Sequence, residues 1–563
     1  MSTKENKFDA IVIGSGITGG WAAKELCEKG LKTLVLERGR DVKHIQDYPT
    51  MNKAPWEFDH FGQPSKKVRE NYPVQSTTYA FNEGTQHFWV NDKENPYSTP
   101  EDKEFRWIRG YHVGGRSLTW GRQSYRLSDI DFEANVKEGI GIDWPIRYKD
   151  LKPWYDYVEQ FIGVSGQNEG LEQLPDGAFQ PPMDMFCVEK DVRKSMKKNW
   201  SDRTMTIGRT ANLTRPVPGR APCQYRNLCS RGCPYGGYFS SNSSTLPAAQ
   251  ATGNMTLRPN SIVESIIYDE EKDKAVGVRI IDAETSETKE YFSTVIFSCA
   301  STLGSTWVLL NSKSNRFSTG LGNSSDTLGK YLMDHHFQVY SRAQFEGYED
   351  EYHYGYRPNG IYVPRFRNLG EKHPDFVRGY GMQGGANRQG WGYGNRKLDF
   401  GAEFKDELMK PGPWEMTLMG FGECLPYEDN TVKLNSNVTD KWGLPTLKID
   451  CEFKENEYAM RKDMAKTTAE ILDAAGGKNL ETFDQDDVPG FAIHEMGTAR
   501  MGRDPKTSVL NAFNQMHDVP NVFVTDGSAM TSSACQNPSL TYMALTARAV
   551  NYAVKEMKKG NIK

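Results

Sequence analysis

Residues 8–19 read FDAIVIGSGITG, and this stretch decides the fold at the start of the chain. Phe8–Ile13 is a short apolar run, as expected of a strand buried in a parallel sheet. Gly14, Gly16 and Gly19 follow in the spacing G-x-G-x-x-G. In that order they permit a tight turn, a close approach of the backbone to a pyrophosphate, and close packing of the next helix on the strand. The sequence therefore predicts a dinucleotide-binding strand, turn and helix.

A second apolar run completes this unit. Leu31–Leu36 reads as the next parallel strand and ends in Glu37, which stands 18 residues after Gly19. A carboxylate in this place is expected to bind the ribose of a dinucleotide, and the helix N-terminus between the strands is expected to face the phosphates. The alternative is a glycine-rich turn without a ligand, but the order of strand, helix, strand and acid favours binding.

Composition limits the remaining possibilities. The chain has 563 residues and a formal net charge of −4, and apolar runs alternate between helix-like and strand-like spacing. We expect an α/β protein of more than one domain, with no nucleic acid as partner because no stretch is strongly basic. No apolar run approaches the roughly 18 residues of a membrane span. The first strand begins so early that we expect no cleavable signal peptide.

The cofactor-binding domain is expected to be discontinuous. A glycine-rich loop at 113–121 can lie against a ring system or a phosphate, Ser261–Tyr268 and Ala275–Ile281 read as a hairpin, and Val295–Ala300 reads as a buried strand that leads into a helix through Leu310. We assign to this domain residues 1–45, 106–135, 225–336 and 490–563. To a substrate domain and its excursions we assign residues 46–105, 136–224 and 337–489.

Residues 337–455 are rich in aromatic, amide and guanidinium side chains, as in 352–356 and 389–393. Alternation at 414–420 and 431–434 predicts an antiparallel sheet. Aromatic faces next to amides suit sugar rings and hydroxyls, although sheet packing and loop decoration would explain the same residues. Ser539–Lys558 predicts an amphipathic C-terminal helix with a basic end.

Taken together, these motifs resemble those of the glucose–methanol–choline (GMC) oxidoreductases over nearly the whole chain. The matching pieces include the segment Asp334–His336, the block HEMGTARMG at 494–502 and the pair Asn537-Pro538. The resemblance implies FAD in a Rossmann-like domain, beneath a substrate domain built on an antiparallel sheet. The cofactor-binding residues that we predict are Gly14, Gly16, Gly19, Glu37, Arg38, Gly114, Gly115, Ser117, Val263, Asp526, Gly527 and Pro538.

The family's catalytic pair is a histidine with a second histidine or an asparagine, and His494 and Asn537 match these two positions. Oxidation of an alcohol removes the hydroxyl proton while hydride leaves carbon for flavin N5. A neutral imidazole is suited to accept that proton at neutral pH, and an amide can hold the alcohol oxygen without competing for the proton. An isolated buried histidine would instead be read as a core residue.

The match departs from the fungal pyranose oxidases at one informative place. Those enzymes carry a histidine bonded to the flavin in the loop that matches residues 115–120, whereas this chain has Thr119 there. We therefore expect the FAD to be bound without a covalent link.

The closest resemblance is to bacterial sugar dehydrogenases. The HEMGTARMG block and the run NPSLT at 537–541 favour glucoside 3-dehydrogenase, which implies oxidation at C3 of a glucopyranoside to a 3-keto sugar. The alternatives are a gluconate, fructose or glucose dehydrogenase, and an oxygen-using GMC sugar oxidase. A flavin-binding module without chemistry would have no need of the pair His494 and Asn537.

Nine scattered cysteines do not suggest a disulfide framework. Cys223, Cys229 and Cys233 stand apart, because three thiols within eleven residues end on Cys-Pro. Three interpretations stay open: a [3Fe–4S] cluster, as the spacing in related dehydrogenases implies, a disulfide with one free thiol, and a zinc site that would need a fourth ligand.

The resemblance also implies partners. Large subunits of this kind work with a small subunit, which often carries an export signal, and pass electrons to a cytochrome or other acceptor. We accordingly expect a small-subunit partner and periplasmic delivery with it; without such a partner, the chain would be cytoplasmic.

Overall fold

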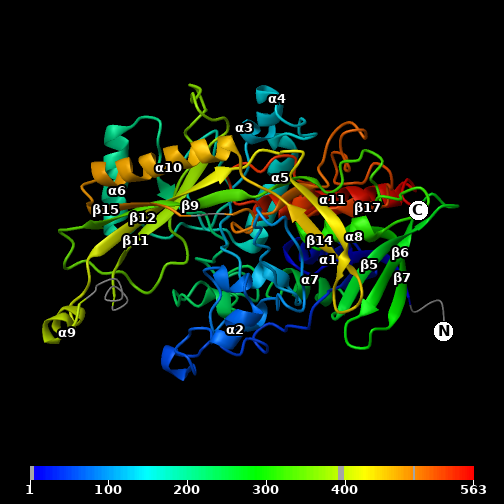
Figure 1. The fold of residues 1–563 in the computed structure, drawn as a ribbon, viewed down its shortest axis with the longest axis horizontal. Helices are drawn as coiled ribbons and strands as arrows, with labels where there is room; N and C mark the ends of the chain where they lie inside the picture. Colours follow the sequence, from blue (N-terminus) through cyan, green and yellow to red (C-terminus); the bar gives the residue numbers. More distant parts are fainter. Residues whose placement is uncertain (1–5, 391–398, 486–487) are drawn as a thin grey trace.

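Two large sheets lie towards opposite ends of the molecule (Figure 1). The computed structural model describes residues 6–390, 399–485 and 488–563. One sheet is mainly parallel and is covered by helices, and the other is antiparallel. The α/β class predicted from the sequence is confirmed, with both kinds of sheet present.

The mainly parallel sheet contains strands from three distant parts of the chain. Its strand order is β4-β2-β1-β7-β6-β5, and β17 also pairs with β7. The strands are β1 (Lys7–Ile13), β2 (Thr33–Leu36), β4 (Met255–Arg258), β5 (Ser261–Asp269), β6 (Lys274–Asp282), β7 (Thr288–Ser298) and β17 (Val522–Val524).

Strand β7 joins the two halves of this sheet. Its first half pairs antiparallel with β6, and its second half lies parallel between β1 and β17. The last four residues of β7 are buried, as are the last four of β1, because helices cover this part of the sheet. The strand and hairpin predictions for this region are therefore confirmed.

The antiparallel sheet has the order β15-β9-β12-β11-β10-β3. Its strands are β3 (Thr206–Ile207), β9 (His335–Phe345), β10 (Ile361–Val363), β11 (Tyr380–Arg388), β12 (Trp414–Glu423) and β15 (Lys478–Asp484). Helix α10 (Glu455–Ala474) lies across β9, β12 and β15 (Figure 1). The other face is left to form the roof of a cavity.

Two short pairs of strands stand outside these sheets. The pair β13 (Thr431–Thr439) and β14 (Pro445–Asp450) is separate, so the prediction that 431–434 belongs with 414–420 in one antiparallel sheet is wrong. The pair β8 (Lys330–Met333) and β16 (Met496–Thr498) connects two distant segments of the chain.

The helices follow the strands that they cover. Gly16 precedes α1 in extended conformation, and α8 begins where β7 ends, so both helices repeat the strand–turn–helix pattern. The C-terminal helix has the predicted bounds but is buried along much of its length, because α1 and α5 pack on it. The remaining bounds are α1 (Ile17–Glu28), α2 (Lys66–Asn71), α3 (Asp129–Phe132), α4 (Ala134–Glu138), α5 (Tyr148–Ile162), α6 (Cys187–Asn199), α7 (Thr245–Ala251), α8 (Thr302–Asn311), α9 (Ala402–Leu408) and α11 (Ser539–Lys558).

A buried ion pair fixes α5 to the preceding segment. The Arg126 guanidinium donates to both carboxylate oxygens of Glu159, with Nε–Oε1 and Nη2–Oε2 distances of 2.8 and 2.6 Å, and neither side chain is exposed. On the same helix, the hydroxyl of Tyr155 is 2.8 Å from that of Thr541 in α11. The pair thus supports the position of the C-terminal helix.

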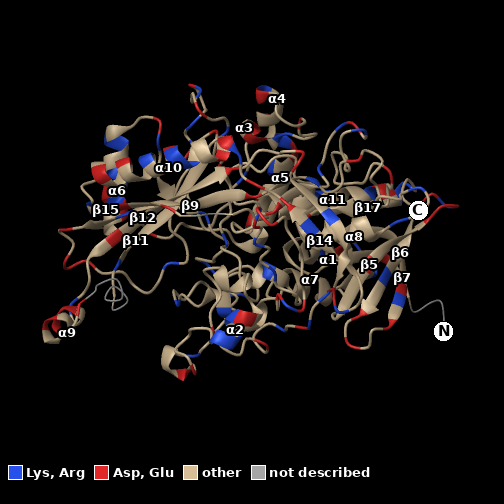
Figure 2. Ribbon diagram, in the orientation of Figure 1, with Lys and Arg blue, Asp and Glu red and all other residues tan. Residues whose placement is uncertain are grey.

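Acidic and basic residues are interspersed on the ribbon in Figure 2. Among the helices of the described residues, none has both the length and the apolar character that crossing a bilayer requires.

Candidate active site

A cavity of about 770 Å³ extends from the glycine turn after β1 to the face of the antiparallel sheet. This volume lies within the range of about 300–1,000 Å³ that is usual for ligand sites. One end is lined by residues of the mainly parallel sheet and its turns, and the other by β9, β11 and β12.

The glycine end of the cavity fits a dinucleotide. Gly14 has φ of +94°, a backbone conformation that a side chain would strain. A Cβ built on Gly16 would meet no atom within 4 Å, so the backbone there is open to a phosphate group. A Cβ on Gly19 would lie 2.0 Å from the Gly14 carbonyl oxygen, so this glycine serves packing rather than lining the cavity.

Glu37 lies at the end of β2, on the wall of this part of the cavity. Its carboxylate accepts hydrogen bonds from the amide and hydroxyl of Ser15, at 3.1 and 2.6 Å, and from the amide of Gly39 at 3.0 Å. Burial raises the pKa of this carboxyl, and these three donors partly oppose the shift.

The structure brings most of the predicted cofactor residues to this one cavity. Gly114 does not line it: a Cβ on Gly114 would lie 1.7 Å from the Asn242 side-chain oxygen, so its role is close packing. Besides the two catalytic candidates, the predicted residues that line the cavity are Gly14, Gly16, Glu37, Arg38, Gly115, Ser117, Val263, Asp526, Gly527 and Pro538.

The far end of the cavity is aromatic and amide-rich. The ring of Phe337 is 5.2 Å from that of Phe421 and 5.5 Å from that of Phe491, measured between centroids. The other side chains of this end include Gln338, Tyr340, Gln383 and Met419. The aromatic run at 352–356 does not contribute, since Tyr352, Tyr354 and Tyr356 are exposed; residues 391–393 of the second predicted run lie outside the described residues.

The two catalytic candidates meet between these ends. Nε2 of His494 is 3.4 Å from Nδ2 of Asn537, and both side chains line the cavity. The Asn537 side-chain oxygen accepts a hydrogen bond of 2.6 Å from Nε2 of Gln383 on β11. The opposite ring nitrogen of His494, Nδ1, is 2.9 Å from Nδ1 of His335 on β9. The imidazole is therefore contacted on both nitrogens.

Local pairing explains how these distant residues meet. Strand β8 pairs with β16, which places Asp334 and His335 beside the segment that ends in His494. The Asp334 carboxylate then accepts hydrogen bonds from the amides of Gly490, Ala492 and His494, at 2.7, 3.2 and 3.0 Å. One buried carboxylate thus shapes the whole turn before the candidate base.

The electrostatics keep the imidazole of His494 neutral. Burial lowers the pKa of His494 well below its usual value, and the neighbouring His335 and Arg116 lower it further. Arg116 forms an ion pair of 3.0 Å with Glu495, the residue that follows His494. A neutral imidazole on a cavity wall can accept a proton, and the amide of Asn537 can donate a hydrogen bond to the same oxygen.

The sequence did not identify Gln383, Arg116 or a role for His335. Gln383 sits in an alternating strand without a motif, and only the fold brings it to Asn537. His335 was noted within the segment 334–336, where two adjacent histidines after a short apolar strand are the one available signal.

None of the three clustered cysteines lines the cavity; they lie in a loop against the segment 48–58. Arg226 and Arg231 of the loop donate to the carbonyl oxygens of Met51 and Lys53. Burial raises the pKa of the Cys223 thiol to about 11, and the nearby Cys229 and Cys233 add to the shift. All three are free thiols, and within the described residues no group of three or more His, Cys, Asp or Glu side chains is arranged to hold a metal ion. The [3Fe–4S] prediction therefore has no support from the side-chain positions.

Known proteins resemble this chain over its full length. It is 30% identical to 2-methyl-1,2-propanediol dehydrogenase of Mycolicibacterium austroafricanum, over 98% of this chain and 96% of that one. It is 26% identical to the fructose dehydrogenase large subunit of Gluconobacter japonicus, over 100% of both chains.

A solved structure has the same fold. A variant of Aspergillus oryzae formate oxidase, from work on FAD modification, superposes with a TM-score of 0.61 at 14% identity, over 99% of this chain and 100% of that one. In addition, residues 8–337 and 426–546 match the two sequence models of the GMC oxidoreductases. The chain therefore belongs to the GMC oxidoreductase family.

Proposed function

We propose that this protein is an FAD-dependent dehydrogenase that oxidises a hydroxyl-bearing carbon of a sugar or polyol. The observation that carries the proposal is the pair of His494 and Asn537, whose facing atoms are 3.4 Å apart on the wall of the cavity that begins at the glycine turn. The relatives named for a propanediol and for fructose act on compounds of this class.

The chain's own residues bind and orient the alcohol. Nε2 of His494 accepts the hydroxyl proton, and Nδ2 of Asn537 donates a hydrogen bond to the oxygen as its bond to carbon becomes a carbonyl. FAD supplies, when bound, the acceptor for the hydride that leaves the same carbon. The ring cluster of Phe337, Phe421 and Phe491 excludes water from this end, and Gln338 and Gln383 offer hydrogen bonds to the remaining hydroxyls.

FAD is expected to be held without a covalent bond to the chain. GMC oxidoreductases bind FAD, and Thr119, which lines the cavity, has no imidazole to link to it. Acid precipitation of the purified protein should leave yellow FAD in the supernatant. A flavin that remains with the pellet would show that another side chain is bonded to it.

The most specific form of the proposal is oxidation of a secondary ring hydroxyl, at C3 of a glucopyranoside, to give a 3-keto sugar. Its support is the resemblance of residues 494–502 and 537–541 to glucoside 3-dehydrogenases. The test is anaerobic: the protein is mixed with a methyl glucoside, glucose, gluconate, fructose and 2-methyl-1,2-propanediol, bleaching of the flavin is followed, and the products are identified by NMR.

Bleaching by the glucoside with a keto group at C3 is the expected result. Reaction only with reducing sugars would point to the anomeric carbon and contradict the C3 assignment. Bleaching by none of these alcohols would contradict the proposed function as a whole. Rapid reoxidation of the bleached flavin by air would favour an oxidase instead of a dehydrogenase.

The proposal includes a partner that takes the electrons onward. A relative is itself named as a large subunit, which supports a small-subunit partner. Periplasmic delivery with that partner and a cytochrome as acceptor are further parts of the proposal. A [3Fe–4S] cluster on Cys223, Cys229 and Cys233 would belong to such a route, and iron analysis of the purified complex decides that part.

A further inference from the structure

A series of hydrogen bonds reaches Nδ1 of His494, the ring nitrogen on the side opposite Asn537. Its first member is the backbone carbonyl of Ala534, which is 2.8 Å from Nε2 of His335. Nδ1 of His335 is in turn 2.9 Å from Nδ1 of His494. His335 is fully buried and does not line the cavity, so it has no contact with a substrate.

The carbonyl oxygen of Ala534 determines which atom donates in each of these hydrogen bonds. A carbonyl oxygen can only accept a hydrogen bond, so Nε2 of His335 carries a proton. Burial lowers the pKa of His335 to about 4, so at neutral pH the ring has no second proton and its Nδ1 must accept. The proton between the two rings therefore sits on Nδ1 of His494, and Nε2 of His494 has a free lone pair.

We propose that His335 is a positioning residue that holds His494 in the one tautomer whose cavity-facing nitrogen can accept a proton. In the other tautomer, the proton would sit on Nε2 and the lone pair would face His335, where no substrate reaches. This inference rests on the proposed function, because it assigns a task to the base of that reaction.

The backbone around Ala534 has an unfavourable conformation, and neighbouring hydrogen bonds stabilise it. Ala534 has φ of 55°, in the left-handed region that non-glycine residues seldom adopt. The hydroxyl of Ser533 accepts from the amide of Cys424 and donates to its carbonyl oxygen, at 3.2 and 2.9 Å. Two residues after Ala534, the side-chain amide of Gln536 donates a hydrogen bond of 3.1 Å to Asp131.

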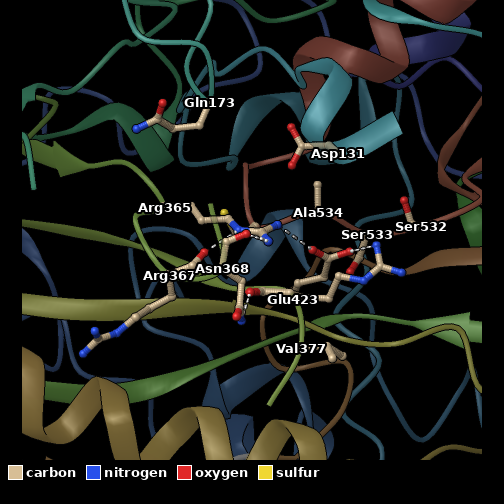
Figure 3. Close-up of polar contacts among 12 residues, drawn as sticks. Asp131, Gln173, Arg365, Arg367, Asn368, Val377, Glu423, Ser532, Ser533 and Ala534 are labelled. Carbon is tan, nitrogen blue, oxygen red and sulfur yellow. Dashed lines mark hydrogen bonds and ion pairs between the residues drawn. The ribbon is translucent and has the colours of Figure 1, made fainter. Parts of the chain in front are cut away.

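A buried ion network lies against this segment. Glu423, the residue before Cys424, lies 3.4 Å from Arg378 and 4.0 Å from Arg365, and all three side chains are almost fully buried. Figure 3 shows Asp131, Arg365 and Glu423 together with Ser533 and Ala534. A carbonyl fixed in this way gives the chain of bonds a rigid origin.

The side-chain amide of Asn537 is oriented by Gln383, which contacts it on the side opposite His494. Because Gln383 donates to the Asn537 oxygen, the amide nitrogen of Asn537 is the atom that faces His494. The charged groups around His494 are Arg116 paired with Glu495, and the Asp334 carboxylate on the backbone amide of His494. Among the described residues, His335 is the group within hydrogen-bond distance of Nδ1 of His494, at 2.9 Å, so His335 sets the tautomer.

Three substitutions separate positioning from packing. In His335→Asn, the side-chain oxygen can take the place of Nδ1 and accept from His494. In His335→Gln, the longer amide can reach Ala534 but offers His494 no such acceptor, and His335→Leu removes both bonds. We expect kcat to fall by about 10²-fold or more in the Gln and Leu variants, since general-base catalysis is worth about 10²–10⁴-fold, and the Asn variant to stay within about tenfold of the wild type. KM should change little in all three.

His336→Leu is the matched control. His336 is the next residue of the same strand and is equally buried, but it does not line the cavity, and its ring centroid lies 5.9 Å from that of Phe453. This variant should keep kcat near the wild-type value, with flavin content and melting temperature measured for every variant. If the Gln variant equalled or exceeded the Asn variant, or if the Leu variant kept its kcat, the positioning role would be wrong.

A second measurement does not depend on turnover. In protein labelled with ¹⁵N-histidine, the Nδ1 and Nε2 shifts of His494, assigned by comparison with His494→Ala, should show the proton on Nδ1. A proton on Nε2 would overturn the inference. The expected shifts in a protein that oxidises no alcohol would instead refute the proposed function and leave the hydrogen-bond chain intact.

Discussion

Replacing His494 with alanine is expected to lower kcat by about 10²–10⁴-fold, the usual contribution of general-base catalysis. The imidazole lines the cavity and its Nε2 faces Asn537, so the variant loses the proton acceptor while the strands that frame the site remain. Flavin reduction by the substrate under anaerobic conditions, measured by stopped flow, reports this step directly. Asn537→Ala should lose less, because the base is still present.

His517→Ala serves as the control for this substitution. His517 is also half-buried, and its ring is 3.1 Å from the Ser508 hydroxyl, but it does not line the cavity. We expect normal flavin reduction in this variant. A His494→Ala protein that reduced its flavin at the wild-type rate would show that another group accepts the proton.

The pH dependence follows from the same surroundings. Because burial, His335 and Arg116 all lower the pKa of His494, its neutral, active form persists below the usual histidine value of about 6.5. In the wild type, kcat/KM should stay constant as pH falls through 6.5 and should decline only at lower pH. A decline centred above 6.5 would contradict this environment.

Replacing Arg126 with alanine is expected to destabilise the protein by about 3–5 kcal/mol, because it leaves a buried carboxylate without its partner. Glu159 is fully buried and takes two hydrogen bonds from Arg126. Helix α5 would lose its anchor, and with it the contact between Tyr155 and the C-terminal helix that follows Asn537. We therefore expect a marked loss of both melting temperature and bound flavin.

Arg279→Ala provides the comparison, because Arg279 forms an ion pair of 2.9 Å with Glu290 in which both side chains are more than one-third exposed. Exposed pairs contribute about 0–1 kcal/mol. Thermal unfolding of the two variants should separate them clearly, and similar melting temperatures would mean that water or another cation compensates Glu159.

The sequence predicted the elements whose signals are local. The run Phe8–Ile13, the glycine turn and the hairpin at 261–281 all have short-range patterns that hydrophobic spacing and glycine conformations determine. The separation of β13 from the antiparallel sheet could not be foreseen, because alternation marks a strand but does not name its partner.

In the site, too, the sequence predicted the residues that stand in local motifs and missed those that only the fold brings together. His494 and Asn537 stand in recognisable blocks, whereas Gln383 and His335 acquire a role only through pairings across 154 and 159 residues of chain. The exposed aromatic residues at 352–356 show the converse error: their composition suited a sugar site, but their position on the surface excludes them from it.

The central strand of the mainly parallel sheet has a consequence for synthesis on the ribosome. Strand β7 pairs with β1 at 7–13 and with β17 at 522–524, so its two parallel neighbours are made at very different times. The sheet therefore stays unfinished until residues 522–524 have emerged, and contacts this distant in sequence form slowly. We therefore expect tight flavin binding only after β17 has paired, and until then the edge of β7 that β17 covers stays open.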